Sequence, residues 1–117
     1  MGALLYGSSQ DSIPLDDRTL AHLQLVILGR LRRGESCGLT YTREDGGSST
    51  RETIWINPAI PMRFVYDSLD RGGPLNRAWV EALAATAAQG DLHPVPEPDG
   101  VPATAVLSGA AKRTLRR

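Results

Sequence analysis

Residues 16–34, DDRTLAHLQLVILGRLRRG, decide the fold because they carry the clearest helical pattern in the chain. Their apolar side chains recur every three or four positions, which is the spacing of one helix face. Asp16 is placed to cap the first turn, and Leu15 and Leu20 are placed to form a hydrophobic staple across it. Gly34 is expected to end the helix after a run of basic residues. The stretch therefore predicts one amphipathic helix whose apolar stripe faces the core.

Short strand-like segments lie on both sides of this helix. Residues 3–6 and 12–15 precede it and predict an opening hairpin. Residues 36–43, 51–57 and 63–66 follow it and predict an antiparallel meander. Because side chains alternate along a strand, the first strand of this meander is expected to have one packed face and one wet face. The packed face would carry Cys37, Leu39 and Tyr41.

A second helix is expected over residues 76–89, with Asn76 as its cap and Gly90 just past its end. Its inward side chains would be Trp79, Val80, Leu83 and Ala87. The predicted fold is a single α+β domain in which an antiparallel sheet of about five strands packs against two helices. The order is ββαβββα, with residues 92–95 as an optional last strand.

Composition and charge narrow the class of protein. The 117 residues are 41% apolar and 22% charged, and no apolar run approaches the roughly 18 residues of a membrane span. Residues 1–100 hold 9 arginines and 13 acidic residues, a formal charge of −4, and residues 101–117 carry +4. We expect a compact domain over residues 1–96 and a flexible, basic tail containing Pro and Gly over residues 97–117. The absence of a signal-like N-terminus and the single cysteine, Cys37, predict a cytoplasmic protein.

Four blocks of sequence carry a family resemblance. They are DRTLAHLQ at 17–24, LRRGES at 31–36, IWINP at 54–58 and LNRAW at 75–79. In these blocks the chain resembles a family of small uncharacterised actinobacterial proteins, over roughly residues 1–97. Members of that family often carry the label "ATP-dependent DNA ligase". The resemblance implies no catalytic residues.

The chemistry of the ligase label can be compared with the residues present. A nucleotidyl-transferring ligase forms an adenylate on the lysine of a Lys-x-Asp-Gly motif, in a much larger fold. The one lysine of this chain, Lys112, is followed by Arg-Thr-Leu in the expected tail. An intact ligase activity is therefore not expected, and the sequence predicts a non-enzymatic protein without a cofactor.

Other candidate chemistry is better explained by structure. His22 and His93 are far apart in sequence and are interpreted as surface or half-buried structural histidines. Cys37 is interpreted as a small core residue, because it alternates with apolar neighbours. The glycine-rich segment 46–50 lacks a phosphate-loop pattern and is interpreted as a flexible hairpin loop. No metal site is predicted.

A basic surface is the first candidate for binding. Arginines end the first helix and recur on the strands, and the tail is basic, so together they are candidates to contact the phosphates of DNA or RNA. The alternative is that these residues complement helix dipoles and carry ordinary solvated charge. The candidate residues are Arg30, Arg32, Arg33, Arg43, Arg51, Arg63, Lys112, Arg113, Arg116 and Arg117.

Trp55 is the second candidate, because it lies between Ile54 and Ile56 on a predicted strand. If the isoleucines face the core, Trp55 faces outward, near Tyr41 or Tyr66 if the strand registers allow. An exposed Trp is suited to stack on bases or to anchor a protein partner. The alternative is a sheet covered on both faces, with Trp55 under a helix. The sequence therefore predicts a binding module that contacts nucleic acid. The alternative is a protein-interaction or homodimerisation domain that uses the sheet face around Trp55.

Overall fold

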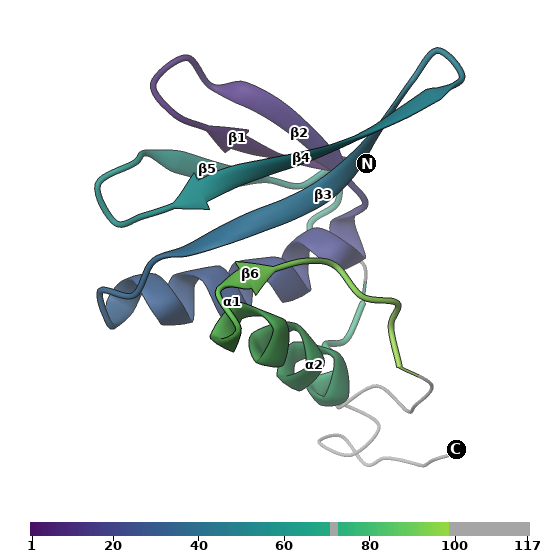
Figure 1. Ribbon diagram of the computed structural model, residues 1–117. Helices are drawn as coiled ribbons and strands as arrows, with labels where there is room; N and C mark the ends of the chain where they lie inside the picture. The colour runs from purple at the N-terminus through teal and green to yellow at the C-terminus, as the bar shows by residue number, and fades with distance from the viewer. Residues whose placement is uncertain (71–72, 99–117) are drawn as a thin grey trace.

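The strands and helices follow one another along the chain in the expected order. The computed structural model describes residues 1–70 and 73–98, to which all structural statements here refer. The elements are β1 (Gly2–Tyr6), β2 (Asp11–Leu15), α1 (Asp17–Arg32), β3 (Cys37–Asp45), β4 (Ser48–Ile56), β5 (Met62–Val65), α2 (Arg77–Ala88) and β6 (Asp91–Leu92), as Figure 1 shows. No described helix is long and apolar enough to cross a membrane.

The strands form two three-stranded sheets rather than one sheet of about five strands. The first sheet, called sheet A below, has the order β2-β1-β5, and the second, sheet B, has the order β4-β3-β6. The opening hairpin is confirmed, because β1 and β2 pair antiparallel. The expected meander was wrong at its last step, because β5 pairs with β1 and not with β4.

The segment between β4 and β5 explains this difference. The side-chain oxygen of Asn57 accepts a hydrogen bond from the amide of Ala59 at 2.8 Å, so the chain turns immediately after β4. Pro61 then accepts a hydrogen bond from the amide of Gly7 at 2.9 Å, which guides the next residues toward β1. Proline has no amide to donate to a neighbouring strand. The chain therefore leaves sheet B here and continues as an edge of sheet A.

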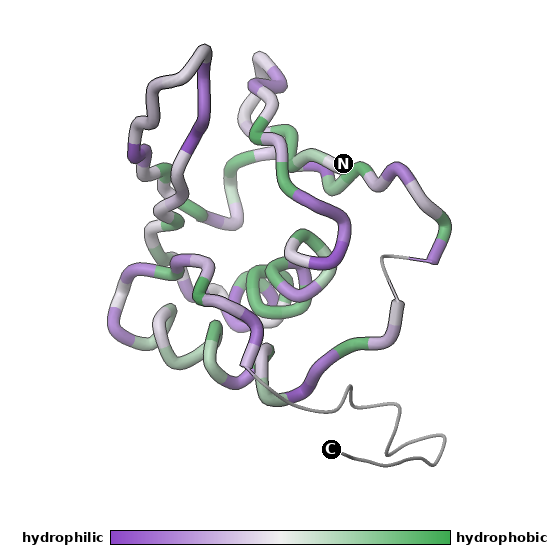
Figure 2. The backbone as a smooth tube through the Cα atoms, turned by 90° about the vertical axis from the view of Figure 1, so that its right-hand side faces the viewer, coloured by the Kyte–Doolittle hydropathy of each residue, from purple (hydrophilic) through white to green (hydrophobic). Residues whose placement is uncertain are grey.

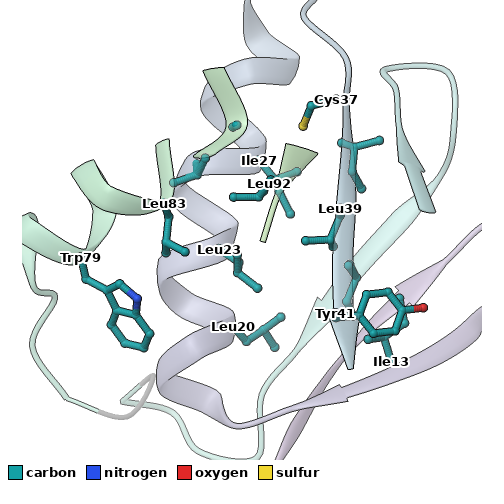
Figure 3. Packing of buried hydrophobic residues seen from close by; sticks show 14 residues of the cluster. Ile13, Leu20, Leu23, Ile27, Cys37, Leu39, Tyr41, Trp79, Leu83 and Leu92 are labelled. Atoms are coloured by element: carbon teal, nitrogen blue, oxygen red, sulfur yellow. The ribbon is translucent and has the colours of Figure 1, made fainter. Parts of the chain in front are cut away.

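Helix α1 lies in the middle of the molecule. Figure 2 shows it nearly end-on, with other elements around it. Asp16 caps it as expected, accepting a hydrogen bond from the amide of Thr19, and Gly34 follows its end with φ +73°. Figure 3 shows Leu20 and Leu23 on the side that faces Leu39 of β3. The predicted core-facing stripe of the first helix is thus confirmed.

Both sheets and both helices contribute to one core. It is formed by Leu4, Ile13, Leu20, Leu23, Val26, Ile27, Cys37, Leu39, Tyr41, Ile56, Trp79, Leu83, Ala87 and Leu92. The expected packed face of β3 is confirmed, because its three predicted residues all belong to this set. Burial of these apolar groups is the main stabilising term for a domain of this size.

The second half of the fold also follows the sequence closely. Asn76 caps α2 through the amide of Trp79, and Gly90 follows the helix with φ +98°. The optional last strand exists as β6, but it covers only two residues and runs parallel to β3. Pro94 follows directly and cannot donate to a strand ladder, which limits its length.

Candidate interaction surface

Sheet B presents one face to the core and the other to solvent. On the solvent face, Trp55 of β4 lies opposite Gly38 of β3, and Gly38 lies opposite Asp91 of β6. The next row contains Thr53 opposite Thr40. The exposed positions on this face include Thr42, Arg51, Thr53, Trp55 and Asp91. We call this surface the outer face of sheet B.

Trp55 is the most prominent apolar group on this face. Its relative exposure is 55%, although its neighbour Ile56 is completely buried. The glycine opposite it is buried even though it lies on the solvent face, which indicates that neighbouring side chains cover its backbone. The interpretation that places Trp55 outward is therefore confirmed, and burial under a helix was wrong.

The expected tyrosine neighbours of Trp55 lie elsewhere. Tyr41 shares the buried face of β3 and donates from its hydroxyl to Glu52 at 2.7 Å. The hydroxyl of Tyr66 donates to the side chain of Gln24 on α1. Tyr6, which the sequence did not single out, instead donates its hydroxyl to the backbone carbonyl of Trp55. This bond ties the end of β4 to sheet A and fixes the strand that carries the indole.

Hydrogen-bonded polar groups lie beside Trp55. The hydroxyls of Thr40 and Thr53 lie 2.8 Å apart, and Thr40 donates to Asp91 at 2.7 Å. A hollow of about 370 Å³ lies next to them, at the point where β6 ends, and its lining includes Arg51 and His93. The outer face of sheet B therefore combines one large apolar side chain with polar groups around it that are already hydrogen-bonded. This combination is common at the centre of protein–protein interfaces.

The structure disperses the candidate arginines. Arg33 forms an ion pair with Glu35 at 3.1 Å, and Arg30 lies 3.7 Å from the same carboxylate. The hydrogen bond from Arg33 is the first cause that holds the pKa of Glu35 below its ordinary value. Glu35 is thus a local ion-pair partner of both arginines. The C-terminal end of α1, where exposed Arg32 also lies, is less positive than its three arginines imply.

The remaining candidates lie on different parts of the molecule. Arg43 lies between the sheets, where it pairs with Glu52 at 3.4 Å and donates to the carbonyl of Ser12. Arg63 is exposed on β5 of sheet A. Of the candidate arginines among the described residues, only Arg51 shares the outer face of sheet B with Trp55. The basic residues from Lys112 to Arg117 lie outside the described residues.

His22 is more buried than the sequence indicated. It was expected at the surface or half-buried, yet it is completely buried. Its Nε2 accepts from the amide of Asn76 at 2.8 Å, so the ring carries its proton on Nδ1, which lies 2.7 Å from the carbonyl of Arg18. Its ring also packs against Trp79 with centroids 4.5 Å apart. These contacts give His22 a structural role between the helices.

The two other candidate groups also have structural explanations. Cys37 is a core residue as expected, and burial raises the pKa of its thiol, which disfavours the reactive thiolate. Gly46 and Gly47, with φ of +58° and +89°, form a tight turn between β3 and β4. The expected loop was too long, because residues 48–50 already belong to β4. Among residues 1–70 and 73–98, no three His, Cys, Asp or Glu side chains gather as metal ligands would.

Glu97 closes the described fold. Its carboxylate accepts from Arg18 at 2.8 and 2.7 Å and from the side chain of Asn76 at 2.8 Å. The hydrogen bond from Arg18 is the main cause that lowers the pKa of Glu97. The segment after β6 is thereby attached to the N-terminal ends of both helices, at the residue where the flexible tail was expected to begin.

These features define a small α+β domain with an exposed aromatic anchor on one sheet face. A family model described as "Domain of unknown function (DUF7882)" matches residues 1–97, so the chain belongs to this family. No curated protein and no solved structure matches the chain. The family match ends at Glu97, the residue that closes the fold.

Proposed function

We propose that this chain is a non-enzymatic binding module that contacts a protein partner through the outer face of sheet B. The observation that carries the proposal is Trp55, which is 55% exposed on an ordered sheet face. Tryptophan at the centre of a contact contributes a large apolar area, and polar groups around it exclude water. Thr40, Thr53 and Asp91 provide such a surround, already hydrogen-bonded to one another.

The distribution of charge favours a protein over nucleic acid. Binding to DNA or RNA depends on basic side chains gathered on one surface, where they displace the counterions of the phosphates. Arg30, Arg33 and Arg43 instead lie beside carboxylates. On the outer face of sheet B, the hollow that Arg51 lines also holds the carboxylate of Asp91. A contact based on apolar area and hydrogen bonds fits this face better.

Nucleic acid is the second candidate partner because of one specific arrangement. Arg51 and Trp55 lie on the same face of β4, a combination that suits stacking on an unpaired base. The basic residues 112–117 add positive charge to the chain. In that case a role beside a ligase would agree with the label of the actinobacterial proteins that the sequence resembles, without an intact ligase activity in this chain.

The positions of the reactive groups support a non-enzymatic role. His22 and Cys37 are buried in the core, and the Nε2 of His22 is already occupied by the amide of Asn76. The free thiol of Cys37 agrees with a cytoplasmic location, which we also propose.

A binding experiment separates the two partners. Tagged protein is incubated with native extract, with and without nuclease, at low and high salt. We expect a protein to be retained under all four conditions, because an apolar contact responds little to salt. Trp55→Thr removes the anchor but keeps a residue that favours strands, so the partner should be lost while the melting temperature is unchanged. Arg63→Gln, an exposed change on sheet A, is the control.

Two results would reject the protein partner. If retention disappears after nuclease treatment or at moderate salt, the partner is nucleic acid and not a protein. Equal retention by wild type, Trp55→Thr and Arg63→Gln would exclude the outer face of sheet B as the contact.

A further inference from the structure

The edge strands of the two sheets differ in how they are protected. Among the described residues, sheet A ends in β2 and β5, and sheet B ends in β4 and β6. Pro14 lies within β2, β5 has only four residues, and β6 has only two. Prolines and short strands keep a sheet edge from pairing with another chain. β4 has neither protection, because it is nine residues long and contains no proline.

The backbone of β4 offers hydrogen-bonding groups along its free edge. In an antiparallel pair, residues that bond across the pair alternate with residues that point away from it. The amide of Gly38 donates to the carbonyl of Gly90, so Gly38 and its opposite residue Trp55 do not bond to each other. The backbone of Trp55 therefore points away from β3. The same alternation turns the amides and carbonyls of Arg51 and Thr53 outward.

This edge is accessible in the part of the chain that the structure describes. Residues 48–51 and 53 of β4 are exposed, and the β3–β4 hairpin extends away from both helices (Figure 1). Near the end of β4, the hydroxyl of Tyr6 donates to the carbonyl of Trp55, which agrees with the outward direction of that carbonyl. A carbonyl oxygen has two lone pairs, so this one can accept a second hydrogen bond.

We propose that two copies of this chain pair through β4, antiparallel about a two-fold axis at Thr53. In this arrangement Thr53 lies opposite Thr53 of the second copy, and Arg51 lies opposite Trp55 of the second copy. The contact uses the same residues from both copies, as a two-fold interface requires. It joins the two copies of sheet B, three strands each, into one continuous sheet.

The side chains of β4 select this register. An axis at Arg51 would place two arginines opposite each other, and an axis at Glu52 would do the same with two glutamates. Like charges that lie directly opposite each other destabilise paired strands. An axis at Thr53 instead places the guanidinium of Arg51 beside the indole of Trp55 from the second copy, where a cation–π contact is favourable.

The pairing goes beyond the contact proposed for the outer face of sheet B. Because side chains keep to their own face of a sheet, the two outer faces become one continuous surface with both Trp55 side chains near its centre. The pairing is made by backbone groups, so it does not require the partner that this surface binds. Trp55→Thr keeps these backbone groups and removes only the cation–π contact.

Sedimentation of the full chain at several concentrations tests the proposal. We expect the mass to rise with concentration from that of one chain to that of two. Thr53→Pro removes an outward amide but no hydrogen bond to β3, so the fold should be kept. It should weaken self-association by about tenfold or more, because the two hydrogen bonds exchanged at Thr53 are lost. Thr42→Pro, the same change at the other edge of sheet B beyond the end of β6, should leave it unchanged.

Disulfide trapping tests the register. Thr53→Cys places two thiols across the axis with Cα atoms about 5.5 Å apart, which a disulfide can bridge. Cys37 does not compete, because it is 1% exposed. We expect mild oxidation to link two copies of Thr53→Cys. Ser49→Cys, on the same strand and face, lies opposite Asn57 of the second copy and should not be linked.

Three results would overturn the proposal. The first is a wild type with the mass of one chain at every concentration. The second is equal self-association of wild type and Thr53→Pro, provided that circular dichroism shows both folded. The third is equally fast disulfide formation by Thr53→Cys and Ser49→Cys, which also decides the matter if Thr53→Pro does not fold. None of these results changes the extract experiment with Trp55→Thr, which tests the outer face separately.

Discussion

His22 shows how one side chain joins the two helices. It belongs to α1, yet its Nε2 accepts the amide of Asn76, which also caps α2. Its burial was not predictable from the sequence, because a histidine on a helix becomes a core residue only when a partner donor is brought to it. That donor lies 54 positions away along the chain.

Replacement of His22 by Ala should lower the free energy of unfolding by about 3 kcal/mol, because a buried cavity forms and the amide of Asn76 loses its acceptor. His93→Ala, at a side chain that is 48% exposed, should change it by less than about 0.5 kcal/mol. Urea denaturation of the two variants measures both values. Equal effects of the two changes would contradict the structural role of His22.

Glu97 should make stability depend on pH in one direction. Its pKa is lowered in the folded protein by Arg18, so its contribution is present above the unfolded pKa and is lost as pH falls through the folded pKa. Glu97→Gln should therefore lower the free energy of unfolding at pH 7 by about 1 kcal/mol. The difference from wild type should disappear well below the ordinary glutamate pKa of about 4.3. Denaturation across this pH range measures it, and a constant difference would contradict the ion pair.

At the scale of elements, local signals predicted most of the structure. Asp16, Asn76, Gly34 and Gly90 mark the helix ends where the sequence placed them. Strand pairing was harder, because the partner of β5 is β1, far away along the chain. The turns at Asn57 and Pro61 that separate β5 from β4 are visible in the sequence, but their direction depends on contacts made only in the folded protein.

The turn of the β3–β4 hairpin gives a prediction for one element. Gly46 and Gly47 both have positive φ, as a type I′ turn requires. Gly47→Ala should destabilise the protein by about 1 kcal/mol, because a Cβ is strained in this conformation. Gly46→Asn creates Asn-Gly, the pair that this turn favours, and should be neutral or slightly stabilising. Thermal unfolding compares them, and the reverse order would contradict the turn type.

At the scale of the whole molecule, the candidate site was only partly predictable. The alternation of side chains around Trp55 was compatible with either an exposed or a covered sheet face. The outcome depends on long-range packing, because both helices and sheet A pack on the other face of sheet B and leave Trp55 exposed. For the arginines, the sequence indicated a shared surface that the fold does not form. Their number in the sequence indicated a basic surface, whereas the fold places Arg43 between the sheets and Arg63 on another sheet.

The proposed absence of ligase chemistry is tested on the whole chain. Incubation with ATP and magnesium should leave the intact mass unchanged, because Lys112 lacks the motif that positions and activates a nucleophilic lysine. A stable adduct with the mass of adenylate on Lys112 would contradict a non-enzymatic role. Lys112→Arg, which keeps the charge, is the control for specific labelling.

The outer face of sheet B can be tested directly by photo-crosslinking in cells. A photoreactive residue replaces Thr53, which is exposed beside Trp55, or Ala85, which is exposed on α2. We predict a protein adduct of defined mass from position 53, its loss when Trp55→Thr is added, and no such adduct from position 85. A nucleic-acid adduct at position 53, or the same protein adduct from both positions, would contradict the account that Trp55 anchors a protein partner.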